Sequence, residues 1–165
     1  MFLRVRYNDN MKAQQKINSP VGPIYLVASE KALLGVYLKR PSVPAAKAGS
    51  PESGILSRVA KELGAYFKGG LKKFTVPLEA EGTAFQKRVW AELSNIPYGQ
   101  TCSYSDIARR IHNGKAVRAV GSANGKNPHC IIVPCHRVIA ADGSLGGYSG
   151  GLKVKTRLLQ LENGR

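Results

Sequence analysis

The chain has 165 residues, of which 43% are hydrophobic and 21% are charged, and this composition excludes wholesale disorder. No apolar run approaches the roughly 20 residues that span a bilayer, and the start MFLRVRYNDN lacks the apolar stretch of a secretory signal. We therefore expect an intracellular protein without membrane attachment, folded as one domain or two small ones.

The charge of the chain is strongly unbalanced. Lys and Arg total 25 against 10 Asp and Glu, so the formal net charge is +15. Such a chain is attracted to polyanions, with nucleic acid as the first candidate and an anionic membrane surface as the second. No acidic residue occurs between Asp106 and Asp142, an interval that contains Arg109, Arg110, Lys115, Arg118, Lys126 and Arg137.

The first half of the chain has the pattern of a small sheet. Gly22–Ser29 and Ala32–Lys39 are rich in β-branched and aromatic residues, and the short turn between them predicts a hairpin. Gln14–Ser19 is a candidate third strand. Residues 40–54 contain three prolines and predict a loop. Apolar residues then recur at every fourth position over Ile55–Phe67 and predict an amphipathic helix.

The second half opens with helix-start signals. Thr83 followed by Gln86 is a capping box, and Ser103 followed by Asp106 is another. The second of these helices is broken at residues 112–114, and a further helix is expected over Ala116–Ala123. Two short helices across a tight glycine-containing turn are the arrangement of a helix-turn-helix motif, which binds nucleic acid in many proteins.

The helix expected after residue 115 carries mostly small side chains, at Ala119, Gly121, Ser122, Ala123 and Gly125. Small residues let a backbone approach its neighbour closely. Two interpretations stay open: tight packing against the core, or a slim helix that enters the minor groove of DNA. In the second interpretation Arg118, near the start of the helix, is the long side chain that reaches into the DNA.

The three cysteines, Cys102, Cys130 and Cys135, are an odd number in a chain without a signal, which argues for reduced thiols. No spacing is C-x-x-C. A metal cluster of Cys130, Cys135, His129 and His136 is disfavoured, because alternate side chains of an extended run point to opposite faces. We expect no metal and no cofactor.

The run CIIVPCHRV predicts a buried strand that ends in a thiol beside an imidazole, at Cys135 and His136. His136 can accept the thiol proton if the chain leaves the strand there, or if a water bridges the two groups. Asp142 and Glu162 are the candidate acids that could orient the imidazole. Glu162 is the last residue of a helix expected over Leu152–Glu162. The helix dipole disfavours an acidic residue at this C-terminal end, so a contact with His136 would explain why an acid stands there.

The stretches FQKRVW, IPYGQTCSYSDIA, RAVGSANGKNP, IIVPCHRVI, GGYSGGLKVK and LLQLE together resemble the O6-alkylguanine-DNA alkyltransferase family. The resemblance runs from Gly82 to Glu162, and over residues 1–78 it holds only in general pattern, with SPVGPIYL near the start. It implies an α+β fold. A small strand-rich, ribonuclease H-like domain would occupy residues 1–78, and a mostly helical domain with the helix-turn-helix would occupy residues 79–165.

The resemblance also implies an activity. An alkylated guanine is flipped out of duplex DNA through the minor groove, and its alkyl group passes irreversibly to Cys135 in a single turnover. His136 would act as base through a water, with Glu162 holding His136. Tyr104 would donate a proton to the leaving guanine, and Asn127 would hinge the segment between the recognition helix and the active-site strand.

The same resemblance assigns the contacts with DNA and with the flipped base. The expected DNA-binding residues are Tyr104, Lys115, Arg118, Ala119, Ser122 and Ala123, with Arg118 filling the hole that the flipped nucleotide leaves. The expected pocket residues are Val133, Pro134, Tyr148, Ser149 and Gly150. Some family members hold a structural zinc in the N-terminal half, but residues 1–101 contain no Cys and no His.

The expected partner is double-stranded DNA that contains O6-alkylguanine, bound by a monomer in the cytoplasm, or in the nucleus of a eukaryote. Cooperative binding along DNA stays open. Three rivals are a non-catalytic lesion-binding protein of the same architecture, a transcription regulator that uses the helix-turn-helix alone, and a cysteine hydrolase. The rivals predict an unmodified cysteine or multiple turnovers.

Overall fold

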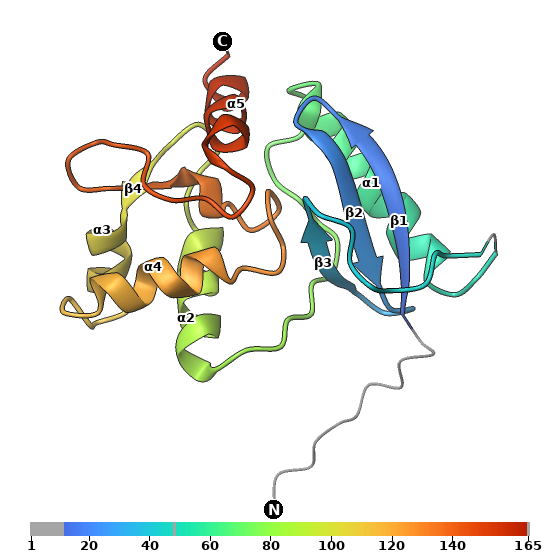
Figure 1. The fold of residues 1–165 in the computed structure, drawn as a ribbon, viewed down its shortest axis with the longest axis horizontal. Coiled ribbons are helices and arrows are strands. Elements are labelled where there is room, and N and C mark those ends of the chain that lie inside the picture. The colour runs from blue at the N-terminus through green and yellow to red at the C-terminus, as the bar shows by residue number, and fades with distance from the viewer. Residues whose placement is uncertain (1–11, 48, 165) are drawn as a thin grey trace, which may run out of the picture.

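The computed structural model describes residues 12–47 and 49–164, and within them the chain forms a sheet domain followed by a helical domain (Figure 1). The first three strands, β1 (Ala13–Ser19), β2 (Gly22–Ala28) and β3 (Leu33–Tyr37), pair antiparallel in the order β1-β2-β3. Helix α1 (Ser53–Phe67) covers one face of this sheet. The predicted strands and helix are therefore confirmed, with shifts of one or two residues at most ends.

The core of the sheet domain forms because β2 and α1 each present one apolar face. Ile24 and Leu26 of β2 are fully buried against the fully buried Leu56, Val59 and Leu63 of α1. The predicted loop contains no helix over residues 40–47 and 49–52. A single bridge joins Ala45 to Gln14 of β1, and the Gln14 side chain donates to the carbonyls of Pro41 and Val43.

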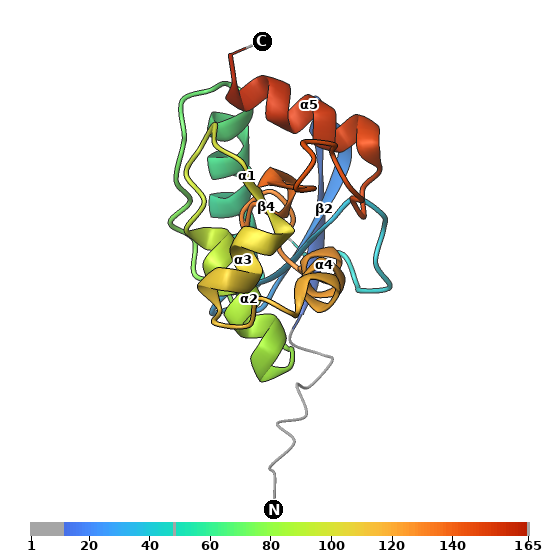
Figure 2. The same ribbon diagram turned by 90° about the vertical axis from the view of Figure 1, so that its left-hand side faces the viewer.

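The helical domain contains α2 (Ala84–Ser94), α3 (Tyr104–Arg110), α4 (Val117–Gly125) and α5 (Leu152–Glu162). Both predicted capping boxes are present: the Thr83 side chain accepts from the backbone of Gln86, and the Ser103 side chain accepts from the backbone of Asp106. Helices α3 and α4 pack together across the turn that follows His112, as the helix-turn-helix prediction requires (Figure 2).

The last helix, α5, has the predicted bounds, but its leucines are unequally buried. Leu158 is fully buried, whereas Leu152 is 52% exposed and does not anchor the helix. Lys155 is fully buried as well. None of the helices in residues 12–47 and 49–164 has the length and apolar composition to cross a membrane.

The prediction of a buried strand over residues 130–138 is wrong. Only Val138 and Ile139 form a strand, β5, which pairs in parallel with β4 (Cys102–Ser103). The segment before it makes a tight turn and then a 3₁₀-helix, Cys135–Arg137. Pro128 and Pro134 lack the backbone donors that a central strand needs. The backbone bonds internally instead, with the Val133 nitrogen donating to the His129 carbonyl at 2.9 Å.

The two domains meet along β3 and the turn that leads to Cys135. The Val36 nitrogen donates to the Pro128 carbonyl at 2.8 Å, and the buried His129 ring lies 2.9 Å from the Leu33 carbonyl through its Nε2 atom. Burial lowers the pKa of His129, so its neutral ring donates this bond. The sheet domain therefore supports the segment that carries the thiol.

Candidate active site and nucleic-acid interface

Cys135 begins the 3₁₀-helix and is only 2% exposed. Its thiol lies beside the side chains of Cys130, Asn127 and Tyr148. A proton shared with Cys130, together with burial, raises the pKa of Cys135 well above its ordinary value. The protein without substrate therefore carries Cys135 as a thiol at neutral pH, and a proton must leave before this sulfur can act as a nucleophile.

His136 faces Glu162 and not the thiol. Its Nε2 atom lies 2.8 Å from a Glu162 carboxylate oxygen, which accepts and so fixes the proton on Nε2. The Nδ1 atom is buried without a hydrogen-bond partner among the described residues, and in this tautomer it is an acceptor. Burial lowers the pKa of His136, so the ring is neutral near pH 7 and can take a proton at Nδ1.

Glu162 is the acid that orients His136, and Asp142, the other candidate, is exposed and caps its own turn through Ser144. The Glu162 carboxylate also accepts from Arg137 Nε and Nη2, both at 2.9 Å, and from the Tyr66 hydroxyl at 2.6 Å. These donors hold the pKa of the Glu162 carboxyl far below its usual range despite burial.

Arg137 and Tyr66 were missed as site residues by the sequence analysis. Arg137 was counted among the cations that attract DNA, but it is buried and bonded to Glu162 and to the Ile96 carbonyl at 2.6 Å. No local sequence signal joins Arg137 to an acid 25 residues away. Tyr66 comes from α1, so the carboxylate that orients the imidazole is also tied to the sheet domain.

Asn127, expected as a hinge, fastens the turn before Cys135. Its side chain donates to the Val133 carbonyl at 2.8 Å and accepts from the His129 nitrogen at 2.9 Å. The same side chain also interacts with Cys135 and favours the thiolate. These bonds replace the strand ladder that the sequence predicted, and they fix the direction in which the thiol points.

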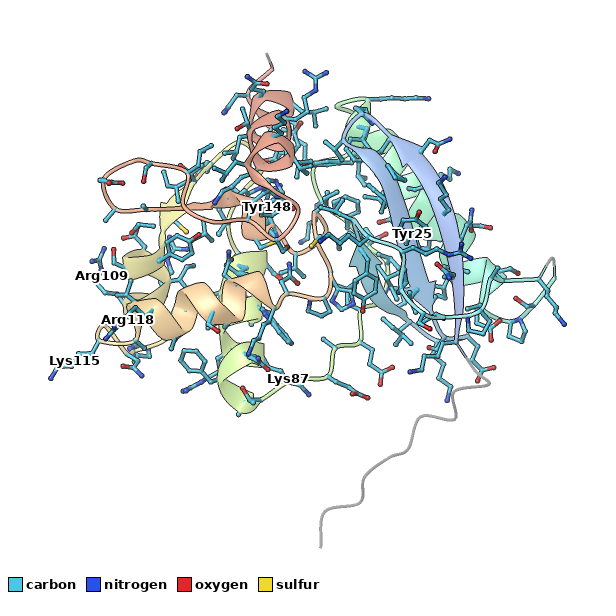
Figure 3. The ribbon with its side chains drawn as sticks, in the orientation of Figure 1. Tyr25, Lys87, Arg109, Lys115, Arg118 and Tyr148 are labelled. Carbon is cyan, nitrogen blue, oxygen red and sulfur yellow. The ribbon has the colours of Figure 1, made fainter. Side chains whose placement is uncertain are left out.

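A hollow of about 540 Å³ lies between α4 and the loop before α5. It is lined by Tyr104, Val117, Arg118, Gly121, Asn124, Gly125, Gly147, Tyr148 and Ser149. The Tyr148 hydroxyl is buried and has no hydrogen-bond partner among the described residues. Tyr148, labelled in Figure 3, lies above α4 in that view. The hollow thus offers the aromatic side chains of Tyr104 and Tyr148 as walls for a planar molecule.

The predicted pocket residues divide between this hollow and its surroundings. Tyr148 and Ser149 line it, and Gly150 lines a neighbouring hollow together with Cys130. The side chains of Val133 and Pro134 are buried outside it, with Pro134 facing a third hollow. The lining residues Val117, Gly121 and Asn124 were not predicted as pocket residues, since their placement depends on how α4 packs against Tyr104.

Lys155 is a further residue of the site that the sequence analysis missed. Its ammonium group donates to the carbonyls of Val138, at 2.6 Å, of Leu145, and of Gly147, at 3.3 Å. It also lies 6.0 Å from the centre of the Tyr104 ring. A buried cation bonded to three carbonyls holds the loop that forms one wall of the hollow.

The exposed face of α4 carries Arg118, Ala119 and Ser122. Ala123 is 2% exposed, and its carbonyl accepts from the Trp90 indole at 2.9 Å, so the prediction that its side chain contacts DNA is wrong. Ala123 lies four positions after the exposed Ala119, but it packs against α2. Figure 3 shows Arg109, Lys115 and Arg118 projecting from the end of the helical domain that is farthest from the sheet.

The packed pair α3 and α4, the cations at its tip, and a hollow whose wall residue Tyr148 contacts the buried Cys135 thiol indicate a class of protein: a nucleic-acid-binding protein with a cysteine as its candidate nucleophile. Two family models match the chain. The 6-O-methylguanine DNA methyltransferase ribonuclease-like domain matches residues 13–80, and the DNA-binding domain of the same name matches residues 84–164. The chain belongs to the methylated-DNA–protein-cysteine methyltransferase family, and the resemblance found in the sequence is confirmed.

Relatives from distant organisms support this assignment. Methylated-DNA–protein-cysteine methyltransferases of Mycobacterium bovis and Methanosarcina acetivorans are 47% and 49% identical to it, over 90% and 87% of this chain and 91% and 94% of theirs.

Solved structures agree with the α+β class predicted from the sequence. A crystal structure of the Mycobacterium tuberculosis O6-methylguanine methyltransferase has a TM-score of 0.84 at 43% identity and covers 94% of each chain. The M. tuberculosis OGT in complex with DNA also has a TM-score of 0.84, at 44% identity, over 92% of this chain and 93% of that one.

Proposed function

We propose that this protein repairs DNA by moving the alkyl group of O6-alkylguanine in duplex DNA onto Cys135, once per molecule. The observation that carries the proposal is the arrangement around the thiol: Cys135 stands in one 3₁₀-helix with a His136 whose tautomer Glu162 fixes. Family membership and the DNA-bound relative support the choice of DNA as partner. A stable thioether forms, so the thiol is not regenerated.

DNA would be bound through the outer face of α4. The net charge of +15 and the exposed cations Arg109, Lys115 and Arg118 would meet phosphates. Ala119 and Ser122 are small and exposed, so this face can approach the floor of a minor groove closely. A groove read in this way gives little sequence information, which suits repair of lesions at any position. Arg118 would occupy the gap left by the flipped nucleotide.

The flipped guanine would enter the hollow between α4 and residues 147–149. A base inside a stacked duplex presents its O6 substituent to the groove and not to a buried sulfur, so extrusion is required. Tyr104 and Tyr148 would stack on or bond the base, and Ser149 stands at the edge of the hollow. The Tyr104 hydroxyl, 3.4 Å from the Gly147 carbonyl, is the proton donor we assign to the leaving guanine.

The chemical step begins with loss of the Cys135 proton. His136 Nδ1 is the acceptor we assign, through a bridging water, and Glu162 stabilises the imidazolium that results. The thiolate then attacks the alkyl carbon in line, a carbon–sulfur bond forms and the carbon–oxygen bond breaks. The electron pair stays with the guanine, which is protonated as it leaves.

Further parts of the proposal concern organisation. We place the domain boundary between residues 78 and 79, a few residues before the gap between the two matched family regions, which end at residue 80 and begin at residue 84. We expect a monomer to act on each lesion, with cooperativity along DNA left open. Because the substrate is chromosomal DNA, we expect action in the cytoplasm, or in the nucleus of a eukaryote.

A stoichiometric titration tests this function. A duplex carrying one labelled O6-methylguanine is mixed with increasing amounts of protein, and label on the protein is counted. We expect transfer to stop at one methyl per molecule, with Cys135→Ser inactive and Cys102→Ser unaffected. Turnover beyond one equivalent would indicate a hydrolase, and binding without transfer would indicate a lesion-binding protein or a regulator.

A further inference from the structure

Cys130 is a second buried thiol beside the candidate nucleophile, and the proposed reaction does not use it. It is 7% exposed. Its sulfur lies 3.9 Å from the Ser149 hydroxyl and 4.0 Å from the Asn127 carbonyl. The same thiol interacts directly with Cys135. A packing cysteine in an apolar core needs none of these polar neighbours.

The turn between the two cysteines brings them together. Ile131 has φ +73°, a left-handed conformation that a β-branched residue rarely adopts. The Ile132 nitrogen donates to the Cys130 carbonyl at 2.9 Å, and the Cys135 nitrogen to the Val133 carbonyl at 2.8 Å. The chain thus reverses on itself within five residues, and the surrounding core keeps Ile131 fully buried.

Cys130 is the more accessible and the more acidic of the two thiols. It lines a hollow of about 370 Å³ that Lys39 and Lys126 also line. The contact with Cys135 and the Ser149 hydroxyl, which can donate to a thiolate, lower the pKa of Cys130. Cys130 is therefore the thiol of this pair that loses its proton more readily.

We propose that Cys130 is a site of reaction with hydroperoxides, and that its oxidised form closes a disulfide with Cys135. The Cys130 thiolate attacks one peroxide oxygen, the oxygen–oxygen bond breaks, and the hydroxide that leaves takes up a proton to form water. The Cys135 sulfur then attacks the sulfenic sulfur, a sulfur–sulfur bond forms, and the hydroxyl group leaves as water with the Cys135 proton. Two electrons pass from the thiols to the peroxide.

The effect of the disulfide on DNA repair rests on the proposed role of Cys135 as alkyl acceptor. The formation of the disulfide does not depend on that role. A Cys135 sulfur held in a disulfide cannot attack an alkyl carbon, so the oxidised protein cannot accept an alkyl group. Reduction by a dithiol restores it. A single-use protein gains from this arrangement, because a disulfide is recoverable and a sulfinic acid on Cys135 is not.

The test compares the whole protein with Cys130→Ser, Cys130→Ala and the matched control Cys102→Ser, which removes the half-buried cysteine of β4. Each reduced protein is treated with hydrogen peroxide, denatured, and reacted with maleimide. Intact mass and non-reducing peptide maps then report cross-links and added oxygen. Alkyl transfer is measured before peroxide, after it, and after dithiothreitol, each relative to the same variant in its reduced form.

We expect the unaltered chain to become two hydrogen atoms lighter, to keep only Cys102 open to maleimide, and to recover at least 80% of its starting transfer activity after dithiothreitol. Cys102→Ser should form the same Cys130–Cys135 cross-link. Both Cys130 variants should instead add oxygen to Cys135 and fail to recover. The proposal is overturned if no Cys130–Cys135 peptide appears, or if the variants recover as well as the unaltered chain. A cross-link in a protein that never transfers alkyl groups would uphold this proposal and defeat the proposed function.

Discussion

Glu162→Gln is the substitution that most sharply tests the buried ion cluster behind the thiol. The Glu162 side chain is 1% exposed and accepts from His136, from Arg137 and from Tyr66. The amide keeps one acceptor oxygen but loses the negative charge, so Arg137, whose side chain is 7% exposed, becomes a buried cation without a counter-charge. Removing one partner of a buried pair costs about 3–5 kcal/mol.

The cost should appear in urea unfolding and in thermal melting. At roughly 2–4 °C per kcal/mol for a chain of this size, the melting temperature should fall by about 6–20 °C. Glu30→Gln, in the exposed turn between β2 and β3, is the matched control and should change the free energy of unfolding by less than about 0.5 kcal/mol. A Glu162→Gln protein as stable as this control would refute the argument for the buried cluster.

The same cluster predicts how stability depends on pH. The pKa of the Glu162 carboxyl in the folded protein lies far below its ordinary value of 4.5. The ionised group therefore contributes its full stability above about pH 4.5, and the contribution is lost as the pH falls below that value. The difference in unfolding free energy between the unaltered chain and Glu162→Gln should be widest near pH 7 and shrink in acid. A difference that stays constant between pH 7 and pH 3 would contradict this assignment.

Three further substitutions test other parts of the structure. Tyr66→Phe removes only the hydroxyl that donates to Glu162 and should cost about 1.5–3 kcal/mol in urea unfolding; a loss below 0.5 kcal/mol would contradict a bond to a charged acceptor. Ser122→Glu puts a negative charge on the exposed face of α4, beside Ala119. It should weaken binding to duplex DNA about tenfold or more, measured by fluorescence anisotropy, and leave the melting temperature unchanged. Equal affinity would show that DNA binds to another surface. Lys155→Met leaves the carbonyls of Val138, Leu145 and Gly147 without their cation. It should lower the single-turnover transfer rate at saturating DNA by roughly tenfold, while the affinity for DNA stays within about twofold. A change in affinity alone would contradict a role of Lys155 in holding the pocket wall.

Local sequence signals predicted local structure well. The capping boxes at Thr83 and Ser103 need only a side chain and a backbone group three residues apart, so tertiary packing does not alter them. The contact between Glu162 and His136 was also anticipated, because an acid at the C-terminal end of a helix requires a stabilising partner.

Features that depend on distant contacts escaped prediction. The β-branched run before Cys135 has the composition of a strand, but two prolines and the Asn127 side chain divert it into a turn, with Ile131 in a conformation that composition cannot reveal. From sequence alone, Arg137 was interpreted as a surface cation, because its partner Glu162 is brought beside it only by the folded chain. The burial of Lys155 likewise requires three carbonyls from segments that only the folded chain assembles.

The most direct test of the account locates the transferred group at a single sulfur. The protein is reacted with duplex DNA that carries O6-methylguanine, digested, and analysed by tandem mass spectrometry of the peptides that contain Cys102, Cys130 and Cys135. The account predicts one methyl thioether, on Cys135, in every molecule that has reacted. A methyl group on Cys130 or Cys102, or an unmodified Cys135 after the lesion has been repaired, would contradict it.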